Sequence, residues 1–159
     1  MQQDVLATVQ ASSPRRWIGV GMLGIVALLV IYVALASPPE TGWQVFLLVI
    51  GFASLWLAQR MWVSTKDAIE LTKSQLRTRS GRPICEIADI VSVDRGVFAF
   101  KPSNGFLVLT RARTKNAWEP GLWWRIGRRI GVGGMTSAAE TKFMSEMLSA
   151  LLMERAESS

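Results

Sequence analysis

The sequence contains no histidine and only one cysteine, Cys85, among its 159 residues. Histidine is the commonest general base near neutral pH and the commonest metal ligand, so its absence removes the usual centre of both kinds of site. One cysteine cannot close an internal disulfide or build a thiolate metal cluster. We therefore expect neither a metal nor a cofactor, and we interpret Cys85 as a small apolar strand residue rather than a nucleophile.

The chain also lacks the short motifs that mark common catalytic and nucleotide-binding sites. It has no P-loop, no dinucleotide-binding fingerprint and no nucleophile elbow. The glycine-rich run at residues 131–134 lacks the lysine of a phosphate-binding loop, so we assign it to the passage from a strand to a helix. Glu86 and Asp89 are close in sequence, but a turn accounts for Asp89 without catalysis. These absences predict that the chain is not an enzyme.

Two long apolar runs stand near the start of the chain. Residues 17–36 carry no charge, and residues 43–63 carry only Arg60, near the end of the run. The hydrocarbon core of a bilayer is ~30 Å thick and a helix rises ~1.5 Å per residue, so about 20 apolar residues cross it. Each run is predicted to be a transmembrane helix. The two prolines in the loop at residues 37–42 prevent the helices from fusing into one.

A cleaved signal peptide is the alternative for the first run. Arg15 and Arg16 followed by apolar residues are typical of such a leader, and residues 34–36 imitate its cleavage site. The run is longer than the apolar region of a typical leader, however, and a second run follows at once. We therefore favour a helical hairpin that spans the membrane.

The basic residues predict the orientation of this hairpin. Arg15 and Arg16 precede the first run, Arg60, Lys66 and Lys73 lie at or after the end of the second, and the connecting loop carries only Glu40. Because cytoplasmic flanks are enriched in lysine and arginine, both termini are predicted to lie in the cytoplasm, with the chain in a bacterial inner membrane. The predicted order is a cytoplasmic N-terminal segment (residues 1–16), the first transmembrane helix (17–36), a short periplasmic loop (37–42), the second transmembrane helix (43–63), a cytoplasmic domain (64–155) and a tail (156–159). Most of the first segment, residues 1–14, is expected to be mobile unless a partner orders it.

Small residues give the hairpin two candidate packing surfaces. Gly21 and Gly24 lie three apart on the first helix, and Gly51, Ser54 and Ala58 form a stripe on the second. Small side chains allow the backbones of neighbouring helices to approach closely. These residues serve either contact between the two helices of this hairpin or a groove for a helix of another protein.

After residue 63 the pattern changes to short strands followed by one helix. Strands are predicted at residues 68–72, 75–79, 83–87, 89–93, 97–100, 106–110, 122–126 and 130–132. Asn104 and Gly105 supply the positive φ angles for a tight turn between residues 97–100 and 106–110. Ser137 and Glu140 predict a capping box at the start of the final helix. Its apolar face is predicted to pack on a sheet, with a partner groove as the alternative, and consists of Phe143, Met144, Met147, Leu148, Leu151 and Leu152.

This order of elements, with the segment Glu-Ile-Ala-Asp-Ile-Val-Ser-Val at residues 86–93, the Gly105-Phe106 strand start and a terminal helix, resembles the bacterial PH-like domains attached to membrane spans. The resemblance implies an α+β membrane protein, with a transmembrane hairpin followed by a small antiparallel PH-like barrel or sheet and one C-terminal amphipathic helix. It also implies a binding or scaffolding module. The architecture is similar to that of assembly and accessory proteins of photosynthetic or respiratory membrane complexes.

Positive charge is the remaining functional signal, since the net charge is +6. Basic residues cluster at 111–115 and 125–129, beside tryptophans. Arginine and tryptophan together suit an anionic membrane surface or a protein interface. Nucleic acid is a third candidate and the least favoured, because no helix-turn-helix or aromatic RNA-binding platform is visible. A basic domain near a negatively charged membrane also needs no ligand to explain its charge. The candidate interface residues are Trp118, Trp123, Trp124, Arg125, Arg128 and Arg129; of the adjacent pair Trp123 and Trp124, only one can face the core.

These observations predict a non-enzymatic accessory or assembly subunit of a larger integral membrane complex, respiratory or photosynthetic. The hairpin would bind laterally in the membrane, and the PH-like domain would cover the cytoplasmic face of the complex. The alternative is an independent lipid-binding or regulatory module that senses anionic headgroups of the bilayer through Arg125, Arg128 and Arg129.

Overall fold

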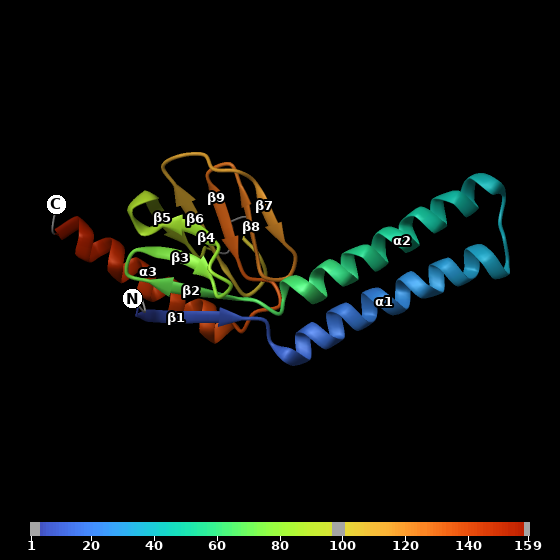
Figure 1. Ribbon diagram of the computed structural model, residues 1–159, viewed down its shortest axis with the longest axis horizontal. Coiled ribbons are helices and arrows are strands. Elements are labelled where there is room, and N and C mark those ends of the chain that lie inside the picture. Colours follow the sequence, from blue (N-terminus) through green and yellow to red (C-terminus); the bar gives the residue numbers. More distant parts are fainter. Residues whose placement is uncertain (1–3, 97–100, 158–159) are drawn as a thin grey trace.

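A long helical hairpin stands out from a β domain in the computed structural model, which describes residues 4–96 and 101–157 (Figure 1). The hairpin consists of α1 (Ser13–Ala36) and α2 (Thr41–Ser64). Both helices are long and apolar enough to cross a membrane. Most of their large apolar side chains, such as Ile25, Leu28 and Phe52, are exposed, and small residues are buried where the two helices meet.

The β domain includes a strand on each side of the hairpin. Strand β1 (Val5–Gln10) precedes α1, strand β2 (Ala68–Thr72) follows α2, and the two strands pair antiparallel. The helices therefore take the place of the turn in a β-hairpin. The meander continues through β3 (Gln75–Thr78) and β4 (Pro83–Glu86), which completes a four-stranded sheet in the order β1-β2-β3-β4.

The prediction that residues 1–14 are mobile is wrong for β1. Val9 is fully buried and Ala7 is nearly so, whereas Thr8 and Gln10 point away from the core. This alternation is the pattern of a half-buried strand. The sequence does not reveal the pairing of this strand, because its partner, β2, follows only after both helices in the sequence.

A second antiparallel sheet faces the first. It contains five strands in the order β5-β6-β9-β8-β7, and a short 3₁₀ helix, η1 (Ile87–Asp89), leads into it from β4. The strands are β5 (Ile90–Asp94), β6 (Phe106–Thr110), β7 (Ala117–Glu119), β8 (Trp123–Ile126) and β9 (Arg129–Val132). The predicted strand at 97–100 lies outside the described residues, and β7 was not predicted.

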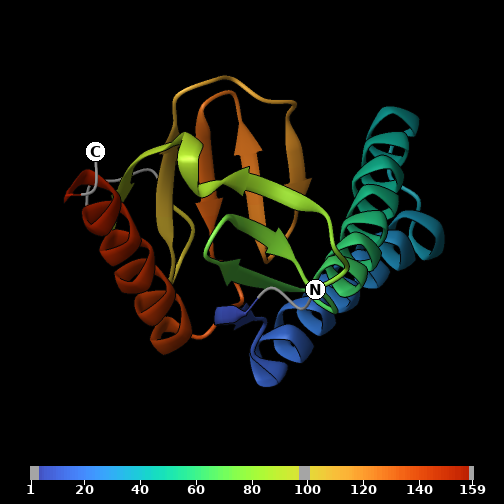
Figure 2. The ribbon, with the colours of Figure 1, turned by 60° about the vertical axis from the view of Figure 1, so that its left-hand side comes forward.

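The C-terminal helix α3 (Ala138–Glu157) closes the domain along β1 and β5, on the side away from the hairpin (Figure 2). Met144 and Leu148 are fully buried, as predicted, but Phe143 is 53% exposed and does not belong to the packed face. The capping prediction also needs correction, because the Glu140 carboxylate accepts a hydrogen bond from the backbone N–H of Gln10 at 2.9 Å. The start of α3 is thus tied to β1.

Candidate interaction surfaces

The hairpin is fixed to the β domain by hydrogen bonds from both helices. At the end of α2, the Ser64 hydroxyl donates to the carbonyl oxygen of Pro120 at 2.7 Å. At the start of α1, Arg15 Nη1 donates to the carbonyl of Thr136 at 2.7 Å, and the Ser12 N–H donates to the carbonyl of Met135 at 2.8 Å. The helices and the domain therefore meet at a defined joint rather than through a loose linker.

Asp67 holds the junction between α2 and β2. Its carboxylate accepts hydrogen bonds from the Ser80 hydroxyl at 2.6 Å and from the Ala68 N–H at 2.9 Å. Burial alone would raise the pKa of Asp67, but these bonds, with a further bond from the Ser80 N–H and the charge of Arg82, lower the pKa below its usual value. The ionised carboxylate thus fixes the start of β2 against the turn after β3.

Aromatic and basic side chains gather at this joint. The rings of Trp17 and Trp62 meet edge to face, with centroids 4.8 Å apart. The Arg16 guanidinium lies 3.9 Å from the centroid of the Trp62 ring and donates a hydrogen bond to the Trp62 carbonyl at 3.1 Å. One layer at the base of the hairpin therefore combines indoles and positive charge.

The structure separates the two sets of small residues in the hairpin. Gly51 and Ala58 are buried between the helices, and Ser54 is half-buried. A Cβ atom added at Gly51 would collide with the side chain of Ile31. A Cβ atom added at Gly21 or Gly24 would meet nothing within 4 Å. The stripe on α2 therefore serves contact within the hairpin, whereas the two glycines of α1 lie on its outer surface.

The adjacent tryptophans of β8 point to opposite faces of the five-stranded sheet, as the strand geometry predicts. Trp123 is buried in the core between the sheets. The ring of Trp124 lies directly over Gly131 of β9 on the outer face, where a Cβ atom would collide with it. Trp118 of β7 is the register partner of Trp124 and is 49% exposed. Trp118 and Trp124 therefore remain candidates for an outer interface.

The three candidate arginines have different environments. Arg125 donates to the carbonyl oxygens of Lys115 at 2.7 Å and Ile84 at 2.6 Å, so it connects the two sheets. Arg128 donates through Nε to the carbonyl of Thr110 at 2.8 Å and remains exposed, and Arg129 is also exposed. Arg125 is consequently a structural residue, while Arg128 and Arg129 face solvent.

Shallow hollows lie on the described surface of the β domain. One, of about 700 Å³, lies on the outer face of the five-stranded sheet and is lined by Leu109, Arg113, Thr114, Asn116, Trp124, Ile126, Gly127, Arg128 and Arg129. The sequence prediction had not joined Arg113 to the arginines of the β8–β9 turn. The hollow therefore unites one predicted tryptophan with residues from both predicted basic clusters.

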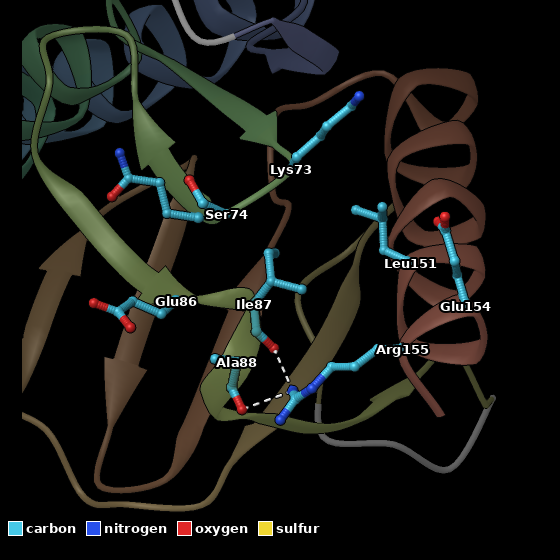
Figure 3. A pocket seen from close by; sticks show the side chains of 9 residues that line it. Lys73, Ser74, Glu86, Ile87, Ala88, Leu151, Glu154 and Arg155 are labelled. Atoms are coloured by element: carbon cyan, nitrogen blue, oxygen red, sulfur yellow. Dashed lines mark hydrogen bonds between the residues drawn. The ribbon is translucent and has the colours of Figure 1, made fainter. Parts of the chain in front are cut away.

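The second hollow, of about 730 Å³, lies between the β2–β3 turn, η1 and the end of α3 (Figure 3). Arg155 crosses it and donates through Nη1 to the carbonyl oxygens of Ile87 at 3.2 Å and Ala88 at 2.8 Å. Lys73 and Glu154 also line it, so the hollow carries charge of both signs. The hydrogen bonds of Arg155 therefore brace α3 against the β domain.

Within the described ranges, no group of three or more histidine, cysteine, aspartate or glutamate residues is placed to hold a metal ion. Cys85 lies in β4, partly buried against the core. Burial raises the pKa of the Cys85 thiol from 9.0 to about 12, an effect that the nearby charge of Arg125 opposes only in part. The thiol is therefore protonated and weakly nucleophilic at neutral pH.

We expect Cys85 in the folded protein to react about a thousandfold more slowly with a disulfide reagent at pH 8 than in the denatured chain, because the thiolate fraction differs by that factor. Labelling followed by absorbance measures the ratio. The rate should rise about tenfold per pH unit above pH 8. Since the folded thiol holds its proton more tightly, its contribution to stability is complete below pH 9 and is lost between pH 9 and about 12. Equal rates in the two states would contradict the shift.

Comparison with protein-family models, curated proteins and solved structures gives no significant match to this chain.

Proposed function

We propose that this chain is a multi-pass protein of the bacterial inner membrane, with α1 and α2 across the bilayer and the β domain and both termini in the cytoplasm. The support is the exposure of large apolar side chains along two helices of 24 residues each, which water would solvate poorly. Arg15, Arg16, Arg60 and Lys66 gather at the end of the hairpin that joins the domain, where the positive-inside rule places cytoplasmic flanks.

The position of β1 argues against a cleaved signal peptide. Cleavage after Ala36 would remove β1 together with α1, and the core would lose Val9 and the edge of the four-stranded sheet. A leader that contributes a buried strand to the mature domain would destabilise that domain on removal. Retention of α1 as the first membrane span is the more consistent interpretation.

The β domain is proposed to be PH-like and to act as a scaffold rather than as an enzyme. A consecutive four-stranded meander, a second antiparallel sheet and a C-terminal helix beside β1 and β5 support the PH-like assignment. The protonated state of Cys85 and the use of Arg125 and Arg155 as braces to backbone carbonyls support a non-catalytic role. We then expect the domain to act through contacts at its surface.

The function that these surfaces support best is that of an accessory or assembly subunit of a larger membrane complex, respiratory or photosynthetic. The observation that carries this proposal is the open surface over Gly21 and Gly24, which α2 does not cover. Together with Leu28 they follow the spacing of one helix face, where backbone exposed by glycine can receive a helix of another protein. The fixed joint would then hold the β domain over the cytoplasmic side of that partner.

The double substitution Gly21→Leu and Gly24→Leu is expected to release the chain from its complex. Leucine side chains would fill the space over both glycines and prevent close approach of a partner helix. Membranes solubilised in a mild detergent would be separated on a native gel and probed for the tagged chain. The wild-type chain should migrate with a large complex, and the double variant as a small species.

The double substitution Ala36→Leu and Ala53→Leu is the control, because it places the same side chain at exposed small residues elsewhere on the hairpin. It should leave the migration unchanged. A wild-type chain that migrates only as a small monomer or homo-oligomer would overturn the assignment as an accessory subunit.

A further inference from the structure

Four cations converge at one end of the five-stranded sheet. The loop between β6 and β7 carries Arg113 and Lys115, the turn between β8 and β9 carries Arg128, and Arg129 is the first residue of β9. Two hydrogen bonds join the loop to the turn: the Thr114 N–H donates to the carbonyl of Gly127 at 3.2 Å, and the Gly127 N–H donates to Asn116 Oδ1 at 3.0 Å. We call Arg113, Lys115, Arg128 and Arg129 the basic rim.

The charge of the basic rim is not neutralised within the described part of the chain. The ion pairs there involve Arg77, Arg79, Arg82, Arg95 and Lys142, and no member of the rim is among them. All four rim residues are exposed. Four unpaired cations held on one short edge of a domain repel one another unless they meet an anionic surface.

Strand β7 lies on the side of the β domain that faces the hairpin, with the basic rim at its start and the contacts to α2 at its end. Strand β7 follows the loop of the rim and contacts α2. The turn after β7 is bonded to Ser64 through Pro120, and Gly121 packs against Met61 and Thr65. Figures 1 and 2 both show β7 as the strand of its sheet nearest to α2, with α3 on the opposite side. A bilayer around α1 and α2 would therefore begin beside the end of β7, and the basic rim is separated from that point by the length of this three-residue strand.

Apolar side chains accompany the cations. Trp118 is 49% exposed on β7, and Ile126 is 61% exposed on β8 beside the rim. An indole next to arginines matches the interfacial region of a bilayer, where aromatic rings lie among headgroups and basic residues meet phosphate. The β7 edge therefore has the residue types of a membrane contact as well as the position.

We infer that the basic rim, with Trp118, binds the anionic phospholipid headgroups of the leaflet at which the hairpin enters the membrane. This inference rests on the proposed insertion of the hairpin, but it does not require a partner complex. It also changes the residues expected to contact lipid. Arg125 is excluded because its guanidinium is bonded to two backbone carbonyls, and Arg113 and Lys115 take its place. The contact would hold the β domain flat against the bilayer.

The test compares headgroup selectivity in the full chain, solubilised in a neutral detergent. The chain is first loaded with dansyl-labelled phosphatidylglycerol, whose binding is detected by energy transfer from tryptophan to the dansyl group. Unlabelled phosphatidylglycerol or phosphatidylcholine is then added, and the concentration needed to displace the labelled lipid gives the affinity for each headgroup. A basic residue near an anionic surface contributes about fivefold to binding, so the triple variant R113Q/K115Q/R129Q should lose about 100-fold in affinity for phosphatidylglycerol. Its affinity for phosphatidylcholine should not change. High salt should weaken phosphatidylglycerol binding by the wild-type chain as well.

The control variant K73Q/R95Q/K142Q removes the same charge from the side of the domain beside α3, far from the hairpin. It should retain at least a third of the wild-type affinity for phosphatidylglycerol. Equal losses in the two variants, or no loss in the rim variant, would overturn the inference. A rim variant that keeps its lipid selectivity but leaves the large complex on a native gel would show that the rim binds an acidic protein surface instead. Failure of the accessory-subunit proposal alone would leave the selectivity intact.

Discussion

The substitution Val9→Asp is expected to unfold the β domain, with a loss of stability of about 4 kcal/mol or more. Val9 lies in β1 opposite Ile69 of β2, and its side chain is completely buried. A carboxylate at this position would be buried without a partner, and a small domain has only about 5–15 kcal/mol of total stability. Near-ultraviolet circular dichroism of the aromatic side chains, which include the buried Trp123, is recorded on the full chain in detergent during heating and measures the loss.

The substitution Val5→Asp makes the same chemical change on the same strand, at a side chain that is 44% exposed. It should alter the melting temperature little, since a solvated carboxylate at the end of β1 carries no burial cost. The contrast tests whether β1 is part of the folded domain. If both variants melt like the wild-type chain, the N-terminal strand contributes nothing to the core.

The sequence alone was sufficient to predict those strands that pair with a strand nearby in the sequence. The segments 68–72 and 106–110 are short runs rich in apolar residues and bounded by turn residues, and the structure has β2 and β6 at these positions. Strand β1 is also rich in apolar residues, yet it precedes an apolar helix and pairs only after the chain has returned through α2. Nothing local in residues 5–10 distinguishes such a strand from a mobile tail. Strand β7 has three residues, too few for a periodicity.

The candidate site was predictable by residue type but only partly by geometry. Alternation along β8 assigned one of Trp123 and Trp124 to the core, and the structure selects Trp123. The same alternation places Arg125 on the same face of the sheet as Trp123. Once Trp123 is known to face the core, the pattern therefore predicts that Arg125 also points inward. The meeting of the two basic clusters did not follow, because it depends on the order β6-β9-β8-β7 and on the bonds between Thr114, Asn116 and Gly127.

The small residues of the hairpin show a similar limit. Gly51 and Ala58 on α2 and Gly21 and Gly24 on α1 satisfy the same pattern of small residues at helical spacing. Which pair faces inward depends on the rotation of each helix, which the turn at residues 37–40 and the joint with the β domain set together. The sequence therefore indicates that close contacts can form, and the structure shows that Gly51 makes one within the hairpin whereas Gly21 and Gly24 do not.

The second large effect is expected for Gly105→Ala, which should cost more than about 3 kcal/mol of stability. The turn at this position was predicted to use positive φ angles at both Asn104 and Gly105, but only Asn104 has one, at 52°. Gly105 is required for another reason. A Cβ atom there would collide with the carbonyl oxygen of Val132 and would lie 2.9 Å from the Cα atom of Gly133. Both are backbone atoms, which cannot move aside as the end of a side chain can.

The clash would propagate because this crossing joins three elements. The Gly134 N–H donates to the carbonyl of Ser103 at 2.8 Å, and the Thr141 hydroxyl of α3 donates to the carbonyl of Asn104 at 2.6 Å. Gly127→Ala is the matched control, since Gly127 has a φ of +61° but open space around its Cα atom, so only backbone strain of about 1 kcal/mol is expected. Comparing the thermal unfolding of the two variants separates the cost of the steric clash at Gly105 from the cost of backbone strain alone. A Gly105→Ala variant as stable as Gly127→Ala would mean that β6 and β9 can separate without disturbing α3.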